Sequence, residues 1–578
     1  MIRRSSPKII YMAITLVMLA AFLAACTGGA APAGALPTAT RATDLVAPEL
    51  ATPEAETEAE APAAGEVVEG GQVNIAMWSP PNNFNPLNSD SSYGQFVIDI
   101  VFDSLTKFND DVQFAPRLAD SWDINEDSTE FTFHLNPDAV WHDGTPVTAA
   151  DVEYTIWAIS DPEIPTNRGA NISFLKGLDG SKRPEGVDTV EGVEVIDDHT
   201  IKLTTNNPVD PLALLEQIGN QVWIIPKHIL EDVAPADFDT QDFWLNPTVG
   251  SGAFKFVRYE TDQFIELERN DDYYMGKPHL DRVIISIVTP ATMVAQLEKG
   301  EVDISAAGGI GDIPLDDWDR VQALSNVTAS SYQDNGYQYM IINGNPDLPW
   351  ADKRIRQALA YGVNRQLIVD SLLKGQGVVA NGPIVPVTFY YNPEIEGQYP
   401  YDPDKAKELL TEAGWDFNSE VTLLVPIGNT VRELSADIIQ ANLAEIGVKV
   451  SIEKMDFPTL ISRFQAGDFD LGLVGWGGTL DPDVRSQYQT GGQYNFGQMS
   501  IPEIDDLLEK GAQTAVPDDR KAIYDEFQTV FLDEMPIVPL YWPLRLAAIN
   551  NRVQNASHII TTNGLLRNID EWWVTDGQ

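Results

Sequence analysis

The side chains best suited to holding a small molecule lie around Trp476, in the sequence Gly475-Trp476-Gly477-Gly478. An indole ring offers a flat surface on which a sugar ring or peptide plane can stack, and the glycines allow close approach. Asp481 follows shortly after and offers a carboxylate to an amine or a sugar hydroxyl. Structural roles fit equally well, because a tryptophan can pack at a tight turn and Asp481 can cap a helix.

Two other places present aromatic side chains with the same dual character. Trp78 ends a segment in which Val73, Ile75 and Met77 alternate with other residues, and it is either a platform or a core residue. Tyr390 stands beside another tyrosine in a loop before a predicted helix, and it either stacks on a ligand or is an exposed turn residue.

The single cysteine, Cys26, offers covalent chemistry. It follows Leu-Ala-Ala at the end of the uncharged residues 9–25, behind Arg3, Arg4 and Lys8. Such a stretch is slightly short for a membrane span and typical of a signal peptide. Leu-Ala-Ala-Cys resembles a bacterial lipobox, in which the Cys thiol is acylated and the Cys becomes the new N-terminus after cleavage. We therefore expect residues 1–25 to be a lipoprotein signal peptide. Lipid on Cys26 would then anchor an extracytoplasmic protein to the cell membrane, the alternative being ordinary secretory cleavage.

Composition excludes some classes of function. The formal net charge is −49, which excludes nucleic-acid binding through a basic surface. No His lies between His279 and His558, which disfavours a transition-metal site, and we expect no cofactor. Gly-x-Ser-x-Gly, His-Glu-x-x-His and P-loop motifs are missing. We therefore expect that the protein is not an enzyme. The rival class is a secreted hydrolase that uses paired carboxylates.

Regular elements follow an Ala/Pro/Thr/Glu-rich segment, residues 26–69, which is expected to be a disordered acidic tether. Alternation predicts strands at 73–77 and 131–135 and hairpins over 193–203 and 254–267. A capping-box pattern at Thr148 predicts a helix, and apolar periodicity predicts others. These other helices are expected at residues 352–373, 403–413 and 432–446, the last followed by a strand at 448–452. The fold class is therefore α/β, with too many residues for one core.

Several segments, in order, resemble the family 5 extracytoplasmic solute-binding proteins, the peptide, oligosaccharide and nickel receptors of ABC importers. The matching segments are LADSW at 118–122, FTFHL at 131–135, WHDGTPVTAADV at 141–152, GSGAFK at 250–255, LEKGEVDI at 297–304, DKRIRQALAY at 352–361, YDPDKAKELL at 401–410, and FDL at 469–471 before Gly475 and Trp476. Most of these residues fit turns, caps and packing positions.

The resemblance implies the type II periplasmic-binding-protein fold, with two lobes, a hinge and an extra subdomain in the first lobe. We expect the first lobe at residues 70–288 plus 539–578 and the second at 289–538. A monomer is expected, whose partners are a solute and the permease and ATPase of an ABC importer.

The resemblance also implies ligand-binding positions. Trp476 and Gly477 belong to a segment that lines the cleft, and Ser92 and Tyr93 to a loop that contacts ligand backbone. Asn429 belongs to a loop aimed at the cleft. The alternative role is a helix N-cap in the loop of Ser92 and Tyr93 and a turn residue at Asn429.

Departures from the family pattern bear on the solute. Dipeptide receptors have an Asp just after Gly-Trp, whereas this chain has Thr479 and Leu480, with Asp481 only nearby. Pro426 and Gly428 occupy the places of an Arg and a Tyr. A longer peptide held by its backbone therefore fits better, and an oligosaccharide stacked on tryptophan is the alternative. A ligand-sensing lipoprotein would use the same fold.

Overall fold

The computed structural model describes residues 67–89, 91–110, 113–306, 308–478, 480–558 and 564–575. The predicted signal peptide, Cys26 and the tether up to residue 66 lie outside the described residues. Within the described ranges, no helix combines the length and the apolar character needed to cross a membrane.

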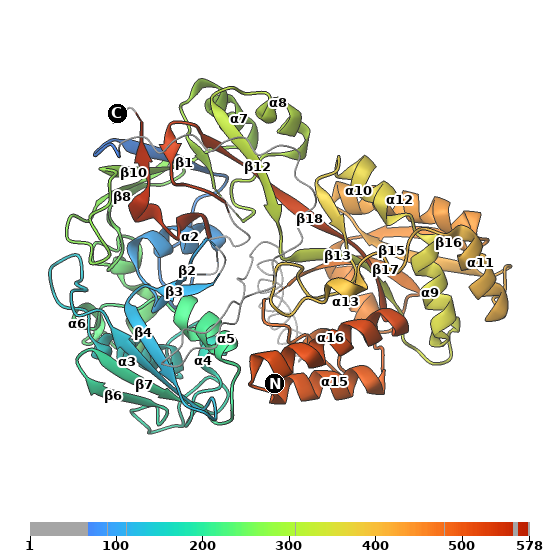
Figure 1. Ribbon diagram of the computed structural model, residues 1–578, viewed down its shortest axis with the longest axis horizontal. Helices are drawn as coiled ribbons and strands as arrows, with labels where there is room; N and C mark the ends of the chain where they lie inside the picture. The colour runs from blue at the N-terminus through green and yellow to red at the C-terminus, as the bar shows by residue number, and fades with distance from the viewer. Residues whose placement is uncertain are drawn as a thin grey trace, which may run out of the picture.

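A mixed sheet of twelve strands extends through the whole molecule (Figure 1). Its main path runs β16-β15-β17-β13-β18-β11-β1-β10-β9-β8, and β12 and β14 pair with β18 off this path. The strands are β1 (Gln72–Met77), β8 (Phe254–Glu260), β9 (Phe264–Arg269), β10 (Arg282–Ile287), β11 (Ile304–Ser305), β12 (Val327–Gln333), β13 (Gly336–Ile342), β14 (Gly377–Val379), β15 (Glu420–Pro426), β16 (Lys449–Met455), β17 (Leu471–Gly477) and β18 (Ile537–Asn550). The expected strands at 73–77 and 448–452 and the hairpin over 254–267 are confirmed.

The molecule consists of two halves, and the chain passes from one half to the other at two neighbouring places. β18, 14 residues long, pairs first with β13 and β14 and then with β12 and β11. Asp334 and Asn335 alone separate β12 from β13. We call residues 67–333 and 544–575 the first half, residues 336–543 the second half, and Asp334 with Asn335 the crossing.

The first half contains a smaller antiparallel sheet in the order β4-β5-β7-β6. Its strands are β4 (Ala119–Ile124), β5 (Glu130–Leu135), β6 (Val193–Asp197) and β7 (Thr200–Thr204), as the alternation predicts for β5 and the hairpin. Other elements of this half are α2 (Ser92–Val101), β2 (Thr106–Phe108), β3 (Phe114–Pro116), α3 (Ala149–Ser160), α4 (Gly169–Ile172), α5 (Pro211–Leu214), α6 (Lys227–Leu230), α7 (Pro290–Lys299), α8 (Trp318–Gln322), β19 (Val553–Gln554) and β20 (Trp573–Val574).

Residues 290–333, which we expected in the second lobe, pack with β1 and the end of β18. Met293, Val294 and Leu297 of α7 share one buried cluster with Ala76 and Ala548. By this packing, residues 290–333 belong to the first half as defined above. The boundaries of the lobes as moving units stay a prediction.

The second half places helices around β15, β16 and β17 (Figure 1). They are α9 (Lys353–Gly362), α10 (Arg365–Leu372), α11 (Pro403–Glu412), α12 (Thr430–Glu445), α13 (Phe457–Gln465), α14 (Arg485–Tyr488), α15 (Pro502–Gln513) and α16 (Pro517–Glu534). The single helix predicted over 352–373 is wrong, because Val363 is extended and the Asn364 side chain caps α10 by accepting a hydrogen bond from Leu367 N at 2.9 Å.

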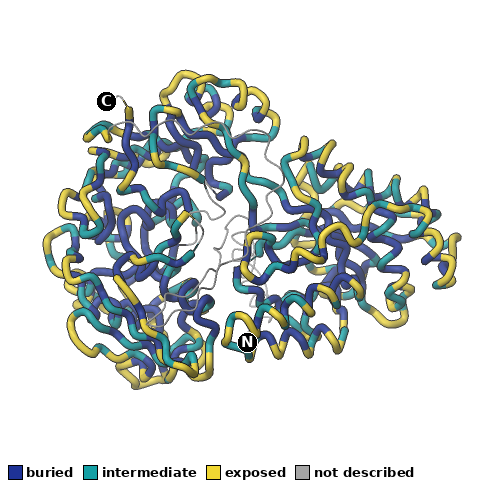
Figure 2. Tube along the Cα trace, viewed as in Figure 1, coloured by how far each residue is buried: buried dark blue, intermediate teal, exposed yellow. Residues whose placement is uncertain are grey.

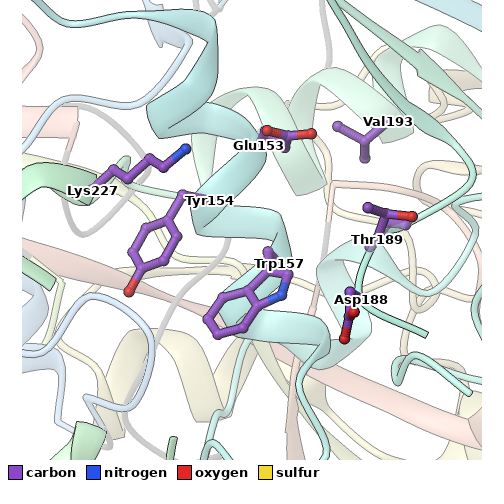
Figure 3. Close-up of a pocket in the computed structure, with 8 residues that line it drawn as sticks. Glu153, Tyr154, Trp157, Asp188, Thr189, Val193 and Lys227 are labelled. Carbon is purple, nitrogen blue, oxygen red and sulfur yellow. The ribbon is translucent and has the colours of Figure 1, made fainter. Parts of the chain in front are cut away.

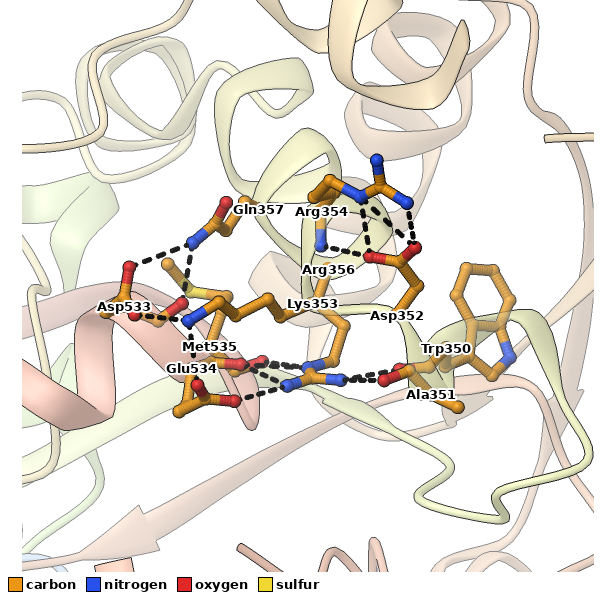
Figure 4. A network of polar contacts seen from close by, with 10 residues as sticks. All are labelled: Trp350, Ala351, Asp352, Lys353, Arg354, Arg356, Gln357, Asp533, Glu534 and Met535. Atoms are coloured by element: carbon orange, nitrogen blue, oxygen red, sulfur yellow. Dashed lines mark hydrogen bonds and ion pairs between the residues drawn. The ribbon is translucent and has the colours of Figure 1, made fainter. Parts of the chain in front are cut away.

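Arg356, in the middle of the DKRIRQALAY segment, anchors α9 to the end of α16 (Figure 4). It is buried, and its guanidinium donates to the carbonyls of Trp350 at 2.7 Å and Glu534 at 2.6 Å. Lys353 binds the Glu534 carboxylate at 2.9 Å. The contacts fix the point where β18 starts, so this family segment has a structural role. Figure 2 shows buried residues in the interior of both halves and exposed residues mainly along their outer edges.

Candidate functional site

Trp476 lies near the end of β17, paired with Tyr337 of β13. Its ring is half-buried, with its centroid 4.9 Å from that of Tyr494. With the Gln487 amide oriented to satisfy its neighbours, its oxygen accepts from the indole Nε1 at 2.7 Å. One aromatic contact and one hydrogen bond hold the ring while leaving part of it accessible, as a stacking platform requires.

The glycines around Trp476 bring β17 against the crossing. Gly477 pairs with Gly336, and Gly478 N donates to Asn335 O at 2.7 Å. A Cβ atom on Gly478 would lie 2.5 Å from that carbonyl oxygen, closer than packing allows. The close approach of the neighbouring backbone thus explains why residue 478 is a glycine. The same strand places Trp476 directly beside the crossing.

The predicted residues of the first half lie at the start of α2 and the end of β1. Ser92 is the first residue of α2, and Ser91 caps the helix by accepting from Tyr93 N at 3.2 Å. Tyr93 is half-buried, and burial together with Asp312 raises the pKa of its phenol. The buried indole Nε1 of Trp78 has no hydrogen-bond partner among the described residues.

Arg545 of β18 connects this region to the crossing. Its guanidinium binds Asp312 at 3.0 Å and Asp334 at 2.8 Å. Burial raises the pKa of Asp312 even though Arg545 opposes that shift. The three side chains carry one net negative charge next to Tyr93. Sequence reasoning missed this cluster, because Arg545 lies 233 residues from Asp312 and no local pattern joins them.

Asp481 and Tyr390 lie in a different environment from the one expected. Arg520 donates to both oxygens of Asp481, at 2.9 and 3.0 Å, and to Asp210 at 2.6 Å. Tyr390, expected to offer an exposed ring, is instead fully buried, and its hydroxyl donates to Asp210. These residues form an ion-pair network between the halves, and sequence reasoning missed both Asp210 and Arg520.

Asn429 has a structural role other than the turn residue that we considered. Its side chain caps α12 by accepting from Arg432 N at 2.9 Å, and it is exposed. The Arg432 guanidinium in turn donates to Gln338 Oε1 at 2.8 Å, which positions Gln338 against Gly475. A contact between Asn429 and a solute stays a prediction.

A cavity of about 150 Å³ lies elsewhere, in the part of the first half that carries the small sheet. Figure 3 shows Glu153, Tyr154 and Trp157 projecting toward it from one helix, α3. Tyr154 stacks on Trp157, with centroids 5.3 Å apart, and the guanidinium of Arg183 lies 4.7 Å from the Trp157 centroid. None of the predicted site residues lines this cavity. In the described part of the chain, no cluster of three or more His, Cys, Asp or Glu side chains could hold a metal ion.

Residues 113–498 match the family described as bacterial extracellular solute-binding proteins, family 5. The oligopeptide-binding protein AppA of Bacillus subtilis is 26% identical over 583 residues, covering 97% of each chain. Heme-binding protein A of Haemophilus influenzae is 30% identical over 483 residues, 78% of this chain and 84% of its own.

The solved structure of B. subtilis AppA in complex with a nonapeptide superposes with a TM-score of 0.66 at 25% identity. The superposition covers 88% of this chain and all of AppA. The fold is therefore that of the type II periplasmic binding proteins. Proteins of this family are extracytoplasmic transport receptors that work with a permease and an ATPase, and they are not enzymes. The chain belongs to the family 5 bacterial extracellular solute-binding proteins.

Proposed function

We propose that this receptor captures oligopeptides and delivers them to an ABC permease while lipid on Cys26 holds it at the membrane. The observation that carries the peptide assignment is the similarity to AppA over 97% of both chains, together with the nonapeptide held by AppA. The departures after Gly475-Trp476 support a peptide longer than two residues.

The solute would lie between the halves, beside the crossing. Trp78, Ser92 and Tyr93 would face it from the first half, and Trp476, Gly477 and Asn429 from the second. The Asp312–Arg545–Asp334 cluster supports this placement, since it fixes the crossing next to Tyr93. Stacking on Trp476 and backbone hydrogen bonds would hold a peptide largely independently of its sequence.

Closure would turn about the crossing and residues 543–544 of β18. Few backbone torsions need to change there, because two adjacent strands carry both passages. A solute that contacts both halves binds the closed form better and therefore shifts the population toward it. The closed form would then dock on the permease through both lobes.

Thermal unfolding of the full chain, with detergent for the anchor, tests this proposal. The panels are mixed peptides of two, five and nine residues, haem, and cello-oligosaccharides. A ligand at 100 times its dissociation constant adds about 2.7 kcal/mol, which gives a visible increase in melting temperature. A shift with the longer peptides is the expected result.

A shift with oligosaccharides alone would replace peptides by sugars and assign Trp476 and Trp78 to stacking. A higher melting temperature with haem alone would indicate that the chain binds haem, as the name of its Haemophilus influenzae relative says of that protein. Either result, like the absence of any shift with peptides, would overturn the peptide assignment while leaving the family unchanged.

A further inference from the structure

The two halves also meet where α5 faces α16, below the crossing in the view of Figure 1. Asp210, directly before α5, belongs to the first half, and Arg520 of α16 to the second. Their side chains are 3% and 5% exposed, and Arg520 Nη1 lies 2.6 Å from Asp210 Oδ2. This is a buried ion pair between two parts of the chain whose backbone connections, among the described residues, are the crossing and residues 543–544 of β18.

The two oxygens of Asp210 have separate tasks. Oδ1 accepts from Leu212 N at 3.0 Å and caps α5, which fixes the carboxylate within its own half. Oδ2 accepts from Arg520 and from the hydroxyl of Tyr390, both in the second half. The cap therefore keeps Oδ2 pointing toward the second half, also when the two halves move apart.

Arg520 has a second partner that stays with it. Asp481 lies in the second half and binds Nη1 and Nη2 at 2.9 and 3.0 Å. The guanidinium also lies 5.2 Å from the centroid of the Tyr390 ring and 5.3 Å from that of Tyr524. If the halves separate, Arg520 keeps one carboxylate and Asp210 becomes hydrated, so no uncompensated buried charge opposes opening.

We propose that Asp210 is a positioning residue for closure, a latch that stabilises the closed receptor by binding Arg520 across the interface. This inference rests on the proposed function only in assuming that the receptor opens and closes. It assigns part of the closing free energy to a buried contact between the halves themselves. The chain without solute should then populate the closed form measurably, and a solute would need less binding energy to complete closure.

Single-molecule energy transfer between the halves tests the latch without any solute. Fluorophores are attached to Glu185→Cys in the first half and Asp506→Cys in the second, both at exposed positions. The full-length chain also carries Cys26→Ser, which removes the only other thiol. The protein with the wild-type interface should show two populations, a closed one with high transfer efficiency and an open one with low transfer efficiency.

Asp210→Asn keeps a good helix cap and loses the charge. We expect it to lower the closed-to-open ratio by roughly tenfold or more at an unchanged melting temperature. Asp210→Ser, which also keeps a capping residue, should lower the ratio to the same extent. Asp210→Glu keeps the charge and should give a ratio between those of Asp210→Asn and the wild type. Tyr390→Phe removes one hydrogen bond to Asp210 and should lower the ratio less than Asp210→Asn does. Asp232→Asn, the same change at an exposed site of the first half, is the matched control and should leave the ratio unchanged.

A wild-type interface without a closed population, or a ratio unchanged in both Asp210→Asn and Asp210→Ser, would overturn the latch. Because no solute is added, these results do not depend on the peptide panel. If the peptides fail to bind, the proposed solute is refuted, but the energy-transfer ratios still decide whether Asp210 acts as a latch.

Discussion

Asp481 accepts two hydrogen bonds from Arg520, one on each carboxylate oxygen, at 2.9 and 3.0 Å. Burial alone would raise the pKa of Asp481, but the guanidinium holds it below its usual value. The carboxylate that we expected to meet a ligand amine thus joins the segment after β17 to α16. A carboxylate bound in this way has little capacity left for a solute.

Replacing Arg520 by Gln should strongly destabilise the fold. The change leaves Asp481, whose side chain is 14% exposed, without its cation inside the second half, and breaking such a pair typically costs about 3–5 kcal/mol. Urea unfolding followed by circular dichroism should show the loss as a lower midpoint.

The matched control is Arg320→Gln. Arg320 also binds a carboxylate, that of Glu298 at 2.6 Å, but its side chain is 47% exposed. Such surface pairs contribute about 0–1 kcal/mol. Equal losses in the two variants would show that burial of the Arg520 network does not matter.

Stability should fall between pH 6.5 and pH 4 because His142 is held neutral. Gly250 N donates to its Nδ1 at 3.1 Å, and its Nε2 donates to Gly252 O at 2.9 Å, a pattern that only neutral imidazole satisfies. Burial, the largest cause, lowers the pKa of His142 from 6.5 to about 4. Between these values the unfolded chain binds a proton that the folded chain does not, so the stabilisation present above pH 6.5 is lost as the pH falls toward 4.

His142→Gln removes this titration. The difference in unfolding free energy between wild type and variant should be smaller at pH 4.5 than at pH 7 by roughly 2 kcal/mol. His134→Gln, at a ring that is 41% exposed, is the control. A difference for His142→Gln that is the same at both pH values would contradict the assignment of neutral imidazole.

The strands could be predicted because burial alternates along them. Phe131, Phe133 and Leu135 are buried in β5, and the residues between them are partly exposed. Helix starts followed from capping chemistry: Thr148 N donates to Asp151 Oδ2 at 2.8 Å, as the predicted capping box requires. These features depend on residues two to four positions apart, which a single sequence displays.

The site was predictable only where its residues belong to local motifs. Trp476, between glycines, could be singled out, whereas Arg520 could not, since its partner Asp210 lies 310 residues away. The break between α9 and α10 was missed for a different reason. Apolar residues recur on both sides of Asn364, at Val363 and at Leu367, and an asparagine is both a weak helix former and a strong cap.

Replacing Trp476 by Ala should weaken peptide binding. Loss of a stacking platform typically costs about 1–3 kcal/mol. The half-buried ring contacts Tyr494 and lies next to the crossing, so the change removes a surface without removing a buried core residue. Isothermal calorimetry with the peptide that gives the largest thermal shift measures the effect.

Trp157→Ala is the matched control for this experiment. Trp157 is also half-buried and stacked, but it lines the separate cavity on α3. Its replacement should leave the affinity unchanged. An unchanged affinity for a correctly folded Trp476→Ala protein would exclude Trp476 from the binding site.

Cys26→Ser should release the protein from membranes into the soluble extracytoplasmic fraction. Acyl chains supply roughly 0.8 kcal/mol for each buried CH₂ group, and this contribution disappears with the thiol that carries them. The formal charge of −49 cannot replace it, since anionic headgroups repel an acidic protein. Fractionation followed by an alkaline wash measures the distribution, with Thr27→Ala as the control that keeps the cysteine. Membrane association of Cys26→Ser that survives the wash, in a chain whose mass shows that residues 1–25 have been removed, would contradict the lipid anchor.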